Sequence, residues 1–78
     1  MQDLPIKLRT LREIQGYKQD FVGKHLGMSQ TGYSKIENGE VDLGIKQLQK
    51  LAELYNTSPA QILDWDGKVS IDKVIYKT

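Results

Sequence analysis

The sequence predicts an all-α domain of five short helices followed by an extended tail. Apolar residues recur at helical spacing over residues 4–55, capping residues mark the helix ends, and β-branched residues cluster only after Trp65. A chain of 78 residues with 38% hydrophobic content can build one compact core. We therefore expect one helical domain over residues 1–65 and a C-terminal tail over residues 66–78.

Periodicity and end signals give the bounds of the first three helices. Leucine and isoleucine residues at helical spacing predict a first helix over residues 4–15. A second helix is expected over residues 19–26, where Gly27 ends it. Ser29 is a good N-cap, because its side-chain oxygen accepts from the free amides of a first turn. A third helix should then cover residues 30–38.

The second half of the chain predicts two more helices and a change of structure. Apolar spacing favours a fourth helix over residues 45–55, with Asn56 as a left-handed C-terminal residue. Ser58 followed by Pro59 is a strong start signal and predicts a short fifth helix over residues 58–64. Residues 69–76 are rich in β-branched and aromatic types with partial alternation, so we interpret the tail as a strand or extended segment.

The charge is nearly balanced overall but uneven along the chain. The net charge is +1, yet up to Ile36 six basic residues meet three acidic ones, and from Glu37 onward five meet seven. This pattern argues against a polybasic, non-specific nucleic-acid binder and suits a protein that touches a few phosphates. The start of the chain lacks the features of a signal peptide, and no stretch is long enough to span a bilayer, so we expect a cytoplasmic location and no membrane partner.

The residue types required for catalysis or metal binding do not come together in the sequence. There is no cysteine, and the single histidine, His25, has no neighbouring acidic cluster. Ser29 and Ser34 have no base partner that would activate them. We expect no enzyme activity, no catalytic residue, no metal and no cofactor.

Residues 19–38 predict two helices joined by a tight turn, with an inner and an outer set of side chains. Gly23 supplies a small residue where the helices cross, and Gly27 supplies the turn. The residues expected to face inward are apolar or aromatic: Val22, Leu26, Met28, Tyr33 and Ile36. The residues left on the outer side of the third helix are polar: Gln30, Thr31, Ser34 and Lys35.

The outer set has the chemistry needed to read base edges. Glutamine pairs with adenine, lysine donates to guanine, and the threonine methyl group packs on the methyl group of thymine, each contact discriminating by about 1–3 kcal/mol. We therefore predict that Gln30, Thr31, Ser34 and Lys35 contact bases in the major groove of double-stranded DNA.

Residues 6–64 resemble the lambda-repressor-like, Cro-type helix-turn-helix domains of the XRE family, whose fold is a five-helix bundle. The resemblance rests on these residues: Leu11-Arg12, Gly16-Tyr17, Gln19, Val22-Gly23, Leu26-Gly27-Met28-Ser29, Ile36-Glu37-Asn38-Gly39, Leu48, Leu51-Ala52 and Tyr55-Asn56-Thr57-Ser58. It implies a sequence-specific transcription regulator, with repression as the expected role, binding a pseudo-palindromic site as a dimer. One small domain contacts few bases alone, so we expect a homodimer. Because the tail offers an unpaired strand edge that can pair with its copy, we expect the tail and the fifth helix to form the dimer interface.

The resemblance also assigns roles to three residues of the brace behind the third helix. It implies that Arg12 pairs with Glu37, joining the first helix to the end of the third. It further implies that Gln19 binds a DNA phosphate and braces the third helix, whereas the plain alternative is a solvated residue in a first turn.

Other basic and polar residues are candidates for phosphate contacts. We expect Lys18, Asn38 and Lys46 to contact the DNA backbone. Lys46 matters because Leu43-Gly44 replaces the Pro-Ser found in many relatives, so a common serine contact is absent here. Lys7 and Arg9 are either at the DNA flank or simply solvated.

Two features leave alternatives open. Gly32, inside the third helix, either permits close approach to DNA or is merely tolerated. Trp65 either covers the helical core or anchors a partner, and the second reading leads to an alternative function, a protein-interaction module such as an antitoxin-like or adaptor subunit. Tyr33 and Tyr55 are expected in the core with hydroxyl groups that reach water.

Overall fold

The structure, a computed structural model, describes residues 4–66, and the regular elements of this segment are helices joined by turns and loops, with no strand. The five helices are α1 (Leu4–Gln15), α2 (Gln19–His25), α3 (Gln30–Glu37), α4 (Ile45–Leu54) and α5 (Pro59–Asp64). Every end lies within one residue of its predicted position, so the all-α class is confirmed. The strand predicted in the tail and its role as a dimerisation strand fall on residues 67–78, outside the described residues.

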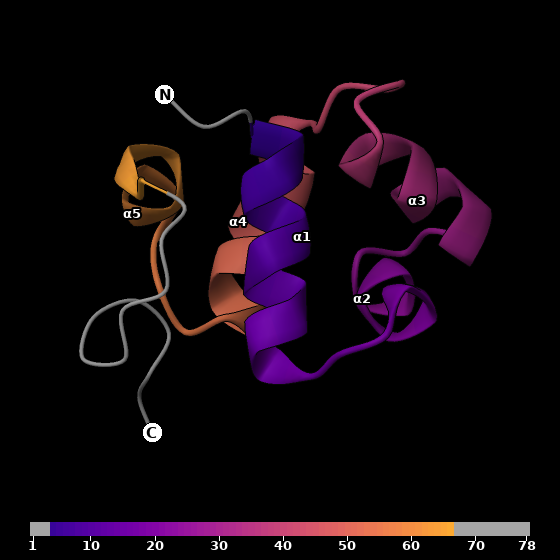
Figure 1. The fold of residues 1–78 in the computed structure, drawn as a ribbon, viewed down its shortest axis with the longest axis horizontal. Coiled ribbons are helices and arrows are strands. Elements are labelled where there is room, and N and C mark those ends of the chain that lie inside the picture. The colour runs from indigo at the N-terminus through magenta and orange to yellow at the C-terminus, as the bar shows by residue number, and fades with distance from the viewer. Residues whose placement is uncertain (1–3, 67–78) are drawn as a thin grey trace.

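The helices are arranged around α1. In Figure 1, α1 runs through the middle of the molecule, with α2 and α3 on one side and α5 on the other. Helix α2 packs on α3 and on α4. In addition, α3 packs on α1, and α4 packs on α5. This arrangement places the α2–α3 pair at one end of the molecule, with its back against α1 and α4.

Local capping signals explain why the helix ends are where the sequence predicts them. The hydroxyl of Ser29 accepts from the amide of Gly32 at 3.0 Å, and that of Ser58 accepts from the amide of Gln61 at 3.2 Å. These bonds satisfy amides that have no partner within the helix. At the C-terminal end of α4, Asn56 adopts the expected left-handed conformation with φ of 58°.

Within residues 4–66, the core is formed by ten buried residues contributed by the five helices and the turns beside them: Leu8, Leu11, Val22, Leu26, Tyr33, Ile36, Leu51, Ala52, Tyr55 and Ile62. Trp65 is half-buried and packs against this core, as the lid alternative expects. Two residues that fit the apolar pattern lie largely outside it, since Phe21 is 49% and Ile45 75% exposed. The ring of Phe21 packs instead on Tyr17, with the ring centroids 4.7 Å apart.

Two buried tyrosines correct one expectation. Tyr33 and Tyr55 lie in the core as predicted, but their hydroxyl groups are buried rather than reaching water. Burial raises the pKa of both phenols, because the charged phenolate is poorly solvated in the core. Both rings therefore remain neutral at physiological pH.

Lys7 is a second correction, because it is neither at the DNA flank nor solvated. Its side chain is buried, and Nζ donates to the carbonyl of Leu63 at 2.5 Å and, more weakly, to that of Ile62 at 3.5 Å. These carbonyls lie near the C-terminal end of α5, where the helix leaves acceptors unpaired and carries negative partial charge. Lys7 thus fastens α5 to α1.

Candidate nucleic-acid interface

Helices α2 and α3 cross closely because glycine lies at the crossing point. A Cβ atom at Gly23 would lie 3.1 Å from the carbonyl oxygen of Ser29 and 3.3 Å from the Cβ of Tyr33. A larger residue would therefore push α3 away from α2. Gly27, in the turn between them, has φ of 76°, a conformation that other residues adopt only with strain. The two predicted roles of these glycines are confirmed.

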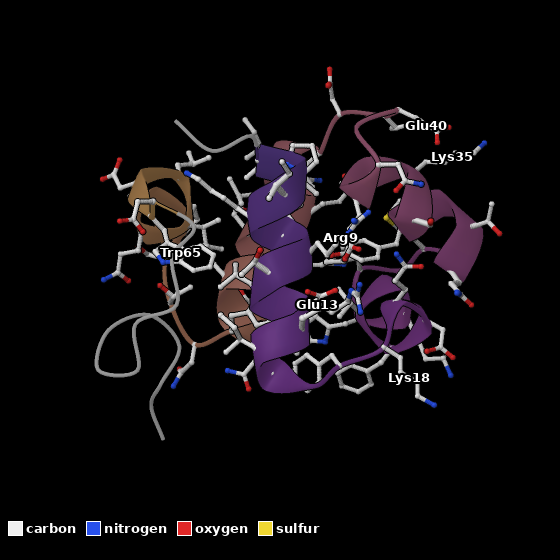
Figure 2. The ribbon with its side chains drawn as sticks, viewed as in Figure 1. Arg9, Glu13, Lys18, Lys35, Glu40 and Trp65 are labelled. Carbon is white, nitrogen blue, oxygen red and sulfur yellow. The ribbon has the colours of Figure 1, made fainter. Side chains whose placement is uncertain are left out.

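The two faces of α3 are distinct in burial. Tyr33 is fully buried and Ile36 is 2% exposed, and both face the core. The predicted base-contacting residues lie on the other side: Gln30, Thr31 and Lys35 are exposed and Ser34 is half-buried. We call these four residues the outer face of α3. Figure 2 shows Lys35 pointing away from the body of the molecule.

The end of α3 is fixed from behind by a buried carboxylate. Glu37 has a side chain with 0% exposure, and Arg12 of α1 holds it in a bidentate pair, with Nε–Oε2 at 2.7 Å and Nη2–Oε1 at 3.1 Å. Gln19, the first residue of α2, donates to Oε1 from Nε2 at 3.0 Å. The geometry agrees with the pairing and bracing roles that the family resemblance implies for these residues. We refer to Arg9, Arg12, Gln19 and Glu37 as the Glu37 cluster.

The hydrogen bonds of the Glu37 cluster determine the charge state of its carboxyl group. Burial alone would raise the pKa of Glu37, because ionisation is costly away from water. The bonds from Arg12 and Gln19 outweigh this effect and lower the pKa below its ordinary value. Arg12 is fixed further by donating from Nη1 to the carbonyl of Tyr17 at 3.1 Å. Glu37 and Arg12 are therefore an ionised pair at neutral pH. Together with Gln19, this pair joins α1, α2 and α3.

Sequence reasoning missed a contact between α1 and the residue that follows α3. Arg9 donates from Nη2 to Oδ1 of Asn38 at 3.1 Å, and its Nε lies 3.8 Å from Oε1 of Glu37. The two partners are separated by 29 residues in the chain. No local signal in the sequence indicates such a pair, because it depends on how α1 packs against α3.

The remaining candidates for phosphate contacts surround α2 and α3. Lys18 is exposed and precedes α2 in extended backbone, and Asn38 is exposed at the end of α3. Lys46 is exposed in the first turn of α4. Gln19 is half-buried, with its amide nitrogen already committed to Glu37. The contacts of all four with phosphate remain predictions.

The first turn of α4 is connected to the helix-turn-helix by Gln47. Its Oε1 accepts from the amide of Gly44 at 2.8 Å, and its Nε2 lies 3.5 Å from the sulfur of Met28. The bond to Gly44 is the half of a capping box that an N3 glutamine supplies, and Gly44 has no side chain to accept from the amides of the first turn. Gln47 therefore holds the start of α4, including Lys46, next to the α2–α3 turn.

We searched the described segment for groups that could bind a metal ion. Among residues 4–66, no group of three or more histidine, cysteine, aspartate or glutamate side chains is arranged to hold a metal ion. His25 is exposed at the end of α2. Within the same segment, no helix is long and apolar enough to cross a membrane.

The fold and this interface define a five-helix domain with a helix-turn-helix whose outer face is polar. The sequence model of a helix-turn-helix family matches residues 8–62, which is most of the chain. The chain belongs to the XRE-family, Cro/C1-type helix-turn-helix proteins. This membership supports a DNA-binding transcription regulator of the XRE type, a class whose domain is not typically enzymatic. No curated protein and no solved structure gives a significant match to the chain.

Proposed function

We propose that this protein is a sequence-specific transcription repressor that reads the major groove with α3 as a homodimer. The observation that carries the proposal is the division of α3 into a fully anchored inner side and a polar outer face. Gln30, Thr31 and Lys35 are exposed and Ser34 is half-buried, whereas Glu37 at the same helix's end is held by three side chains. A polar helix face fixed in this way suits base-edge reading, because misplacement would cost the bidentate contacts.

The phosphate contacts supply the rest of the proposed interface. Lys18 and Asn38 lie at the start of α2 and the end of α3, and Lys46 lies in the neighbouring first turn of α4. Contacts from these residues to the DNA backbone would set the register of α3 in the groove without reading sequence. Gln19 is proposed to have both roles, because its side chain braces Glu37 and it is the first residue of α2, next to Lys18.

Sequence selection from a random pool of double-stranded DNA at stated salt tests the proposal. We expect one enriched motif of two related half-sites, with centres about 34 Å apart. The double variant Gln30→Ala, Lys35→Ala should lose preference for that motif while keeping its melting temperature. The matched control is Gln49→Ala, Lys50→Ala, which removes the same residue types from exposed positions of α4. If the Gln30→Ala, Lys35→Ala variant binds every DNA sequence with the same affinity as the wild type and the control variant, the assignment of α3 is refuted.

The dimer is tested separately by truncation. Removing residues 67–78 should shift the protein toward the monomer in analytical ultracentrifugation, because the proposed interface includes the tail and α5. An unaltered dimer would remove the tail from the proposal. The alternative, a protein-interaction module that holds a partner through the Trp65 tail, makes DNA binding secondary and predicts that the change at Gln30 and Lys35 leaves partner binding intact.

A further inference from the structure

Asn38 occupies a position where its orientation decides what it can bind. It follows α3 directly and is exposed, so its side chain is accessible to a partner of the outer face. An asparagine amide has one end that only accepts hydrogen bonds and one end that only donates them. DNA phosphate oxygens accept, so Asn38 can bind phosphate only if its NH2 group points outward.

Arg9 fixes this orientation. Its guanidinium has donors and no acceptor, so the group that it meets at 3.1 Å must be the amide oxygen of Asn38. The NH2 group is thereby turned away from Arg9. Because the assignment follows from the chemistry of arginine, it does not depend on distinguishing nitrogen from oxygen by position alone.

Arg9 is itself tethered, although its side chain is 49% exposed. Its Nε lies 3.8 Å from Oε1 of Glu37, whose side chain is fully buried and held by Arg12. Figure 2 shows Arg9 on the side of α1 that faces α2 and α3. The guanidinium of Arg9 therefore connects the exposed side-chain amide of Asn38 to the buried carboxylate of Glu37.

We propose that Arg9 is a positioning residue that orients the Asn38 amide so that its NH2 group donates to a DNA backbone phosphate. The proposal rests on the proposed DNA-binding function and adds to it a residue of α1 that reads no base. Its competitor is direct contact between Arg9 and phosphate, which would make the bond to Asn38 incidental.

A double-mutant cycle in DNA affinity separates these two roles. The variants are Arg9→Met, which keeps the aliphatic stem, Asn38→Ala, and the two combined, each measured on the selected DNA site. Positioning predicts that Arg9→Met weakens binding about tenfold in the wild-type background, the effect of one hydrogen bond to a charged group. In the Asn38→Ala background the same change should cost less than about twofold, because the two residues act through one contact. Equal losses in both backgrounds would overturn the proposal.

The salt dependence of binding identifies what Arg9 does if the cycle fails. Loss of a direct phosphate contact makes the slope of log affinity against log salt shallower by about 0.9. An equal loss in both backgrounds together with that shallower slope would establish direct contact and exclude positioning.

Asn38→Asp provides the matched control. Aspartate keeps an acceptor for Arg9 but has no NH2 group to donate, so the melting temperature should be retained while affinity falls at least as far as in Asn38→Ala. Wild-type affinity in Asn38→Asp would overturn the proposal, because it would show that the donor is not used.

An NMR measurement on the free protein keeps this inference distinguishable from the function on which it rests. The side-chain NH2 group of Asn38 should be ordered in the wild type, by heteronuclear relaxation, and mobile in Arg9→Met. An amide equally mobile in both proteins would refute the positioning. Failure of the wild-type protein to select any DNA would instead refute the proposed function, and the relaxation data would still decide whether Arg9 holds the amide.

Discussion

Replacing Arg12 by alanine is the most direct test of how the helix-turn-helix is held. The change removes two hydrogen bonds to Glu37 and one to the carbonyl of Tyr17. Glu37 would keep its bond from Gln19 and the distant Arg9, but its side chain has no access to water. An uncompensated buried charge of this kind destabilises a protein by about 3–5 kcal/mol. We expect Arg12→Ala to lose that much free energy of unfolding.

The loss is large compared with the stability of so small a domain. At about 0.05–0.15 kcal/mol per residue, a chain of this length has a free energy of unfolding of about 4–12 kcal/mol. Urea denaturation followed by far-ultraviolet circular dichroism measures the difference. With a slope of about 1 kcal/mol per molar urea, the midpoint should fall by about 3 M or more, or the variant should be unfolded without urea.

Two controls make the result interpretable. Lys24→Ala removes an exposed cation from α2 and should cost less than about 0.5 kcal/mol. The double variant Arg12→Met, Glu37→Met removes both charges and should be more stable than Arg12→Ala, because no buried charge is left alone. A cost below about 1 kcal/mol for Arg12→Ala, or an unchanged melting temperature with loss of DNA binding, would refute the bracing role.

Three further changes test the neighbouring contacts. Because the pKa of Glu37 is lowered in the fold, its contribution to stability is present above the ordinary value of 4.5 and is lost as pH falls through the folded value. Urea midpoints of the wild type should therefore drop on acidification, and a pH dependence just as steep in Glu37→Gln would contradict this. Lys7→Met should cost about 1–3 kcal/mol in thermal melts because the carbonyl of Leu63 loses the donor that Lys7 supplies, whereas Lys50→Met, at an exposed site, should cost almost nothing. Gly32→Ala should stabilise the protein by about 0.4–1 kcal/mol, since the nearest side-chain atoms would lie 3.4 Å from the new Cβ atom. Reduced DNA affinity in that stabilised variant would support close approach of DNA at this position, and unchanged affinity would support simple tolerance.

The helices were predictable because their ends depend on nearby residues. Serine caps, proline at a first helical position and left-handed glycine or asparagine act within one turn, so the sequence carries the full signal. The inner and outer sides of α3 followed from helical spacing alone. The predicted cap is confirmed at Ser29, whose hydroxyl accepts from the amide of Gly32. The predicted inner side of α3 is confirmed at Tyr33, which is fully buried.

The contacts of the charged side chains required the tertiary structure. Lys7 follows the pattern of a surface residue, yet it meets a carbonyl 56 residues away and is buried. Arg9 is likewise explained only by the packing of α1 against α3. Phe21 and Ile45 fit an apolar pattern but are exposed. In short helices such as α2, with seven residues, and α4, with ten, only the side chains that face a packed helix are buried. The pairing of Arg12 was expected from family resemblance, since no spacing rule in the sequence identifies Glu37 as its partner.

The arrangement of the Glu37 cluster makes the stability of the fold and the presentation of α3 depend on one carboxylate. Glu37 accepts from α1 and α2 while belonging to α3, so any rotation of α3 relative to these helices must break a bond to a buried charge. Within residues 4–66, the side chains of the outer face form no such bond to the core. Variants of Gln30 or Lys35 should therefore lower affinity at constant stability, whereas variants of Arg12 should lower both together. A variant of Arg12 that loses affinity with unchanged stability would separate the brace from the reading surface and contradict this coupling.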